Sequence, residues 1–173
     1  MYLNCHSFHS LRYGTIPLLD LVQQAVFCGV KIMALTDINT VTGIYDFIKA
    51  CKEAEIKPLV GIEFRCNHQL RYIGLAKNTN GLAEMNRFLT KNNFENSPLQ
   101  STAPDFNDVT IIYSFENKPT KLKAHEYIGI APDQLPKLFL PEWKVLLHKM
   151  VVLQPVTFRT KREFNLHKIL RAI

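Results

Sequence analysis

The chain has 173 residues, of which 47% are hydrophobic and 21% charged, with a formal net charge of +6 at pH 7 and a pI near 9.2. These values are ordinary for one globular domain with a real core. The longest apolar runs are far shorter than the ~18 residues of a membrane-spanning helix, which excludes that class and predicts no membrane partner.

Four cysteines, Cys5, Cys28, Cys51 and Cys66, are widely spaced and form no Cys-x-x-Cys pair. We expect buried free thiols rather than a disulfide or a cysteine metal site, because a free cysteine in an apolar segment behaves as a small hydrophobe. The first residues show no basic leader before a long apolar segment, so no secretory signal is expected. The cysteine pattern predicts a reducing compartment, most simply the cytoplasm.

The positive charge favours proximity to nucleic acid or another polyanion, although most of the basic residues are dispersed. One denser cluster lies near the C-terminus and comprises Arg159, Lys161, Arg162, Lys168 and Arg171. A solvated helix face and a phosphate-facing surface both explain this cluster.

The first 65 residues predict three strands that alternate with two helices. The apolar pattern places strands at 2–6, 30–35 and 59–64, one helix between Thr15 and Gly29, and another at 43–54. Thr15 is the expected cap of the first helix, Pro17 lies in its first turn and Gly29 is its stop. This alternation is typical of parallel βα units, in either a barrel or an open doubly wound sheet.

The rest of the chain predicts further strands and helices without a domain boundary, so we expect a single domain over residues 1–173. The predicted elements are a strand at 70–77, a helix containing Leu82 to Leu89, a polar connection at 92–108, a strand at 109–115, a basic and weakly helical segment at 118–124, a strand at 127–130, a short helix at 132–140, an amphipathic segment at 143–148, and a strand at 150–158 interrupted by Pro155. Thr160 to Glu163 has the pattern of a capping box that opens a final helix. That helix reaches Ile173 without a stop signal, so we expect a piece of a longer protein.

Candidate metal ligands stand at three of the predicted strand ends: His6, with His9 nearby, then Asp37 and Glu63. The ends of parallel strands converge on one mouth of a barrel, and these side chains suit zinc, manganese or iron. Each residue also has an ordinary explanation, because a strand-end aspartate often caps a helix or binds a loop and a histidine is often a satisfied polar residue. Only the convergence of all of them indicates a metal site.

The chain resembles the PHP domain (polymerase and histidinol phosphatase), in particular the one that opens the alpha subunit of bacterial DNA polymerase III. The stretches that carry the resemblance are HSFHSLRYG, LVQQAVFCGVKIMALTD, GIYDFIKACKEAEIKPLVGIEF, YIGLAKNTNGLAEMNRFL, EYIGIAPDQL and VVLQPVTFRTKREFNLHKILRAI. It spans nearly the whole chain and is most specific through residue 90. The resemblance implies an α/β fold, a distorted (β/α)7-type barrel related to the TIM barrel, with a trinuclear metal site in active members.

Position by position, the resemblance implies that much of this metal site is missing. His6, Asp37 and Glu63 are retained, whereas the family's other ligand positions hold Asn4, Tyr13, Ile38, Pro155 and Thr157. Three metal ions held close together need many anionic or imidazole donors. We therefore expect no catalytic residues, and at most one weakly bound divalent ion, zinc or manganese, at His6, His9, Asp37 and Glu63.

The leading interpretation is the N-terminal PHP domain of a replicative polymerase, with a structural and interaction role in DNA replication. Its expected partners are the remainder of the polymerase chain, primer–template DNA and a proofreading exonuclease subunit. The alternative is a metal-dependent phosphoesterase or 3'-5' exonuclease with a reduced metal site. A third interpretation is a free-standing PHP-like protein with some other partner.

Overall fold

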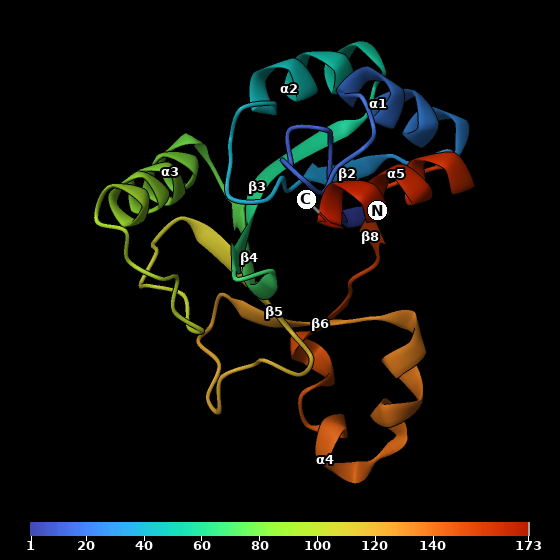
Figure 1. Ribbon diagram of the computed structural model, residues 1–173. Coiled ribbons are helices and arrows are strands. Elements are labelled where there is room, and N and C mark those ends of the chain that lie inside the picture. Colours follow the sequence, from blue (N-terminus) through green and yellow to red (C-terminus); the bar gives the residue numbers. More distant parts are fainter. Residues whose placement is uncertain (173) are drawn as a thin grey trace. The chain divides into compact units, whose positions relative to one another are not determined.

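The computed structural model describes residues 1–172, apart from the side chain of residue 142 (Figure 1). The chain forms two compact units: residues 1–63 together with the chain from Pro155 onward, and residues 64–154. Ile173, the expected uncapped helix end, lies outside the described residues. The α/β class is confirmed, whereas the complete (β/α)7 barrel remains a prediction.

The first unit contains a parallel sheet in the order β3-β2-β1-β8. Its strands are β1 (Tyr2–Cys5), β2 (Ile32–Leu35), β3 (Lys57–Cys66, of which the last three residues belong to the second unit) and β8 (Pro155–Val156). All three neighbouring pairs in this unit run parallel. Their carboxyl ends therefore open on the same edge of the sheet, as the sequence predicts.

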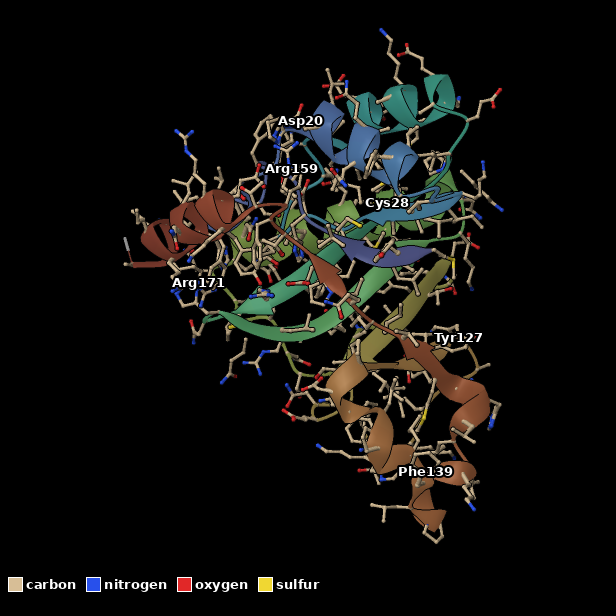
Figure 2. The ribbon with its side chains drawn as sticks, turned by 90° about the vertical axis from the view of Figure 1, so that its right-hand side faces the viewer. Asp20, Cys28, Tyr127, Phe139, Arg159 and Arg171 are labelled. Carbon is tan, nitrogen blue, oxygen red and sulfur yellow. The ribbon has the colours of Figure 1, made fainter. Side chains whose placement is uncertain are left out.

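Helices α1 (Leu18–Phe27) and α2 (Ile44–Glu53) connect these strands and lie side by side in both views (Figures 1 and 2). The stop at Gly29 is confirmed, because this residue has φ +66° and its N–H donates to Val26, while Val30 donates back to Ala25. A left-handed residue with these two bonds closes a helix end. The expected cap at Thr15 is wrong: Pro17 holds that position, and it has no side-chain donor or acceptor.

Helix α5 (Lys161–Ala172) follows β8, and none of its described side chains is fully buried. The predicted capping box is half present, since the Glu163 N–H donates to Thr160 Oγ1 over 3.2 Å. The Glu163 carboxylate, however, accepts from the backbone N–H of Arg159 over 2.6 Å instead of from Thr160. The His167 ring meets the ring of Tyr13 edge-on, with centroids 4.6 Å apart.

The second unit contains β4 (Gln69–Ala76), β5 (Val109–Ser114), β6 (Glu126–Ile130) and β7 (Met150–Val152). The β4–β5 pair is antiparallel, and the β5–β6 and β6–β7 pairs are parallel. Helix α3 (Thr79–Phe94) is capped by Asn78, whose side chain accepts from the Gly81 N–H over 3.0 Å. This helix extends into the stretch predicted as a connection, in which Leu99 and Phe106 are also buried.

Short helical pieces fill the region after β6: η1 (Pro132–Phe139), α4 (Pro141–Lys144) and η2 (Leu147–Lys149). The weak helix predicted at 118–124 is wrong, because this segment forms bends around Pro119, and the ammonium of Lys118 lies 4.3 Å from the Trp143 ring centroid. The strand predicted at 150–158 is interrupted at Leu153–Gln154, so β7 belongs to the second unit and β8 to the first.

All four cysteines are free. Cys5 and Cys51 are buried as predicted, whereas Cys28 is exposed and Cys66 is partly exposed. The burial prediction fails at Cys28 because it follows the last residue of α1, where the chain turns outward to Gly29. No helix in the described part of the chain is long and apolar enough to cross a membrane.

Candidate functional site

A cluster of buried polar side chains occupies the carboxyl edge of the first unit's sheet. His6 follows β1, Asp37 lies just beyond β2, Glu63 is in β3 and Thr157 follows β8. His6 and Glu63 have no exposed surface, and Asp37 and Thr157 are also buried. The parallel sheet thus gathers the strand-end residues His6, Asp37 and Glu63 at one edge, as the sequence predicts.

Glu63 is the acceptor at the centre of this cluster. Its Oε2 accepts from Asn4 Nδ2 over 2.9 Å and lies 3.0 Å from His6 Nε2. The Asn4 amide is in turn oriented by Thr36, whose hydroxyl donates to Asn4 Oδ1 over 2.9 Å. A buried carboxylate needs such donors, because an unpaired charge in an apolar interior is strongly unfavourable.

The His6 ring is held at both nitrogen atoms. An ionised carboxylate only accepts, so the contact with Glu63 requires a proton on His6 Nε2. The other nitrogen, Nδ1, lies 3.0 Å from Thr157 Oγ1, and in the neutral ring it accepts the hydroxyl proton. The ring of Tyr13 meets the His6 ring edge-on at 5.2 Å and lies between it and His167 of α5.

Asp37 organises the loop that follows β1. Its Oδ1 accepts from the Ser7 N–H over 2.7 Å and from Ser10 Oγ over 2.6 Å, and its Oδ2 accepts from Ser7 Oγ over 2.7 Å. Ser10 Oγ also accepts from the Ile38 N–H over 3.1 Å. This geometry is that of a carboxylate that holds a loop, which is the ordinary explanation of a strand-end aspartate.

The structure places His9 apart from the other candidates. Its ring packs against the ring of Phe8 at an angle of 39°, with centroids 4.3 Å apart, and a Cβ on Gly43 would stand 2.7 Å from His9 Cδ2. His9 therefore lines a hollow beside α1 and α2.

The side chains gathered here do not have the arrangement of a metal centre. Among residues 1–172, no three histidine, cysteine, aspartate or glutamate side chains are grouped so that they could hold an ion. Glu63 Oε2 and both oxygens of Asp37 already accept hydrogen bonds from protein donors. Three carboxylate oxygens of the cluster are therefore engaged by protein donors.

Three further residues belong to the cluster although the sequence patterns do not predict it: Ser7, Ser10 and Thr36. Each is short and polar and stands within four residues of a predicted strand end, and this position is the local sign of a place in the cluster. Their roles depend on Asp37 and Asn4, which are about 30 residues away in the sequence, and a local pattern does not report such pairs.

A family model described as the PHP domain matches residues 3–125. The chain belongs to the PHP domain family. The matched stretch includes Asn4, His6, Asp37 and Glu63, so most of the buried polar cluster lies inside the PHP region.

Curated relatives of this PHP domain are bacterial DNA polymerases. DNA polymerase III subunit alpha of Staphylococcus aureus (strain N315) is 28% identical over 182 residues, which cover 99% of this chain and 16% of the relative. Error-prone DNA polymerase of Symbiobacterium thermophilum is 34% identical over 90 residues, which cover 52% of this chain and 8% of that protein. The PHP chain thus spans only a small part of the length of the relatives it matches.

Among solved structures, an amidohydrolase from Chromobacterium violaceum aligns with a TM-score of 0.42 at 20% identity, over 54% of this chain and 34% of that one. A Bifidobacterium adolescentis protein, assigned as a metal-dependent phosphoesterase, aligns with a TM-score of 0.41 at 22% identity, over 52% of this chain and 32% of that one.

Proposed function

We propose that this PHP domain is the N-terminal part of a bacterial replicative DNA polymerase III alpha subunit, and that it acts in replication as a structural and interaction module. The similarity to the Staphylococcus aureus subunit over 99% of the chain supports this assignment. In this proposal the chain completes a distorted (β/α)7-type barrel in a cytoplasmic polymerase, and nucleotide transfer is carried out by residues outside this chain.

The observation that carries the structural role is the contact between Asn4 and Glu63. At the position of Asn4 the family resemblance expects a histidine, whose ring nitrogen offers a lone pair to a metal. The Asn4 amide instead offers a proton, and it gives that proton to Glu63 Oε2 over 2.9 Å. Thr157, at another expected ligand position, binds the His6 ring. Residues that would share an ion therefore share hydrogen bonds instead.

The proposed partners are the remainder of the polymerase chain, primer–template DNA and a proofreading exonuclease subunit. The net charge of +6 supports a position near DNA, because a positive surface attracts the phosphate backbone. A coding sequence that continues from this segment into a polymerase palm domain would establish the parent protein. A coding sequence without one would overturn the polymerase assignment.

Metal analysis tests the loss of the metal site. The purified protein is stripped with a chelator, incubated with excess manganese or zinc, desalted, and analysed by mass spectrometry for bound metal. We expect less than one ion per chain after desalting. Two or more retained ions per chain would overturn the proposal.

A nuclease assay tests the alternative function, a phosphoesterase or 3'-5' exonuclease with a reduced site. Hydrolysis of p-nitrophenyl phosphate and of single-stranded DNA is measured with manganese, for the native protein and for Glu63→Ala. We expect the same background rate from both. Activity that the native protein shows and the variant lacks would favour the enzyme.

A further inference from the structure

A continuous groove runs along the surface between α1 and α2 of the first unit. It consists of two hollows of about 540 Å³ and 210 Å³. Leu19, Ala50 and Glu53 line both hollows, so they are parts of one groove. Phe8 and His9 lie at one end of it, and Val26 lies at the other.

Apolar side chains along this groove are exposed to solvent, whereas many other apolar side chains of the chain are buried in its core. The exposed fractions are 48% for Phe8, 62% for Leu19 and 52% for Val26. Ala50, whose side chain is a single methyl group, forms the floor between the helices, and the small size of this residue leaves the groove open. Contiguous exposed apolar surface of this kind marks interaction sites more often than single exposed residues do.

The charge of the groove is opposite to that of the whole chain. Three carboxylates, Asp20, Asp46 and Glu53, line it together with one ammonium group, Lys49. Asp20 is held by Arg159 over 3.0 Å (Figure 2), whereas Asp46 and Glu53 are exposed at the rim. A net acidic rim around an apolar floor, on a chain with net charge +6, selects a partner that is apolar on one side and basic at its flanks.

We propose that the groove between α1 and α2 is a docking site for a basic amphipathic helix of a partner protein. Helix α1 has 10 residues, so the groove is roughly 15 Å long and accommodates about three helical turns. An amphipathic helix places its apolar face in such a groove and its charged residues at the rims. The groove shares no residue with the Asn4–Glu63 cluster, so this inference does not depend on the proposed function.

Two designed peptides probe the site, each of about 14 residues and with the same helical pattern of leucines. One carries lysines on its polar face and the other carries glutamates, and both are labelled for fluorescence anisotropy. We expect the Leu/Lys peptide to bind more tightly to the folded protein. Nonspecific attraction to a chain of charge +6 favours the Leu/Glu peptide instead. The order of the two affinities therefore distinguishes binding in the groove from nonspecific attraction.

Charge reversal at the rim provides the matched test. In the double variant Asp46→Lys with Glu53→Lys, we expect at least about tenfold weaker binding of the Leu/Lys peptide and a gain for the Leu/Glu peptide. The control double variant, Glu116→Lys with Asp133→Lys, makes the same change of net charge at exposed positions of the second unit. It should leave the Leu/Lys affinity within about twofold.

Leu19→Ser tests the apolar part of the groove. Leu19 is exposed, so we expect this variant to fold normally, and circular dichroism checks that it does. We expect it to weaken the Leu/Lys peptide by about fivefold or more, in line with the loss of one apolar anchor. The proposal is overturned if neither peptide binds, if the Leu/Glu peptide binds the native protein more tightly, or if the control double variant weakens binding as much as the rim variant does.

Discussion

The amide of Asn4 and the ring of His6 converge on the same oxygen atom, Glu63 Oε2, over 2.9 and 3.0 Å. Both donors are buried, and each is fixed on its far side by a threonine hydroxyl, Thr36 for Asn4 and Thr157 for His6. Both donors help to offset the charge of the buried Glu63 carboxylate. The stability of the first unit should consequently depend on these hydrogen bonds.

Asn4→Asp should destabilise the protein, because it replaces a donor to Glu63 with a second buried carboxylate of the same shape. We expect the free energy of unfolding to fall by about 2–4 kcal/mol, as when a buried polar pair is broken. Urea denaturation at pH 7 measures it, in the presence of EDTA so that no metal ion offsets the repulsion. The exposed Asn80→Asp, in the first turn of α3, is the matched control and should stay within about 0.5 kcal/mol of the native protein.

Thr157→Val should also destabilise the protein, since it keeps the shape of the side chain and removes the hydroxyl that binds His6 Nδ1. A buried nitrogen atom without a partner costs about 1–3 kcal/mol. The same urea titration applies, with the exposed Thr120→Val as the control. Equal stability of the two variants would show that His6 does not depend on Thr157.

The sequence predicts the first unit well because its signals are local. Buried parallel strands appear as continuous apolar runs, the two helices have clear apolar periodicity, and Gly29 marks the end of α1. After β6, the short helix expected at 132–140 is confirmed as η1. Pro141 then opens α4, which has four residues and is too short for a periodic pattern. The break of the last predicted strand at Leu153–Gln154 also has no local signal beyond Pro155.

The candidate site is predictable only as a set of strand ends. The sequence brings His6 and Glu63 to one edge, and the structure places them 3.0 Å apart. What each carboxylate binds depends on distant partners: the serines that hold Asp37 precede it by 27 and 30 residues. A strand-end aspartate has the same local signature whether it binds serines or a metal.

Glu55→Gly should stabilise the protein. Glu55 is exposed and has φ +56° at the end of α2, where its N–H donates to Lys52 and the Ile56 N–H donates to Cys51. Side chains disfavour this left-handed conformation and glycine does not, so we expect a gain of about 0.5–1 kcal/mol in the free energy of unfolding. Glu53→Gly, two residues earlier and helical, is the control and should cost about 1 kcal/mol. Effects of the same sign in both variants would contradict the left-handed cap.

The four thiols should react with Ellman's reagent at very different rates. Burial raises the pKa of Cys5 to about 12 and that of Cys51 to about 11, so thiolate is scarce at both at pH 8, and both side chains are covered from solvent. Cys28 is exposed and should react first, and Cys66 should follow more slowly. Cys28→Ser should remove the fast phase, and all four thiols should react in urea. Rapid labelling of Cys5 in the folded protein would contradict its burial.

The contact between Arg159 and Glu163 should make stability depend on pH. The Arg159 side chain, which donates from Nε over 3.0 Å, and the Arg159 backbone N–H hold the pKa of Glu163 below its ordinary value of 4.5. A depressed pKa in the folded state contributes stability that is present above pH 4.5 and is lost as the pH falls through the lower, folded-state pKa. We expect Glu163→Gln to lower the free energy of unfolding at pH 7 by about 1 kcal/mol, and the difference from the native protein to shrink as the pH falls from 5 to 3.

Urea titrations of both proteins across this pH range measure the difference, with Glu116→Gln as the exposed control. A difference that stays constant from pH 7 to pH 3 would show that the charge of Glu163 does not contribute and that only its shape matters at the start of α5.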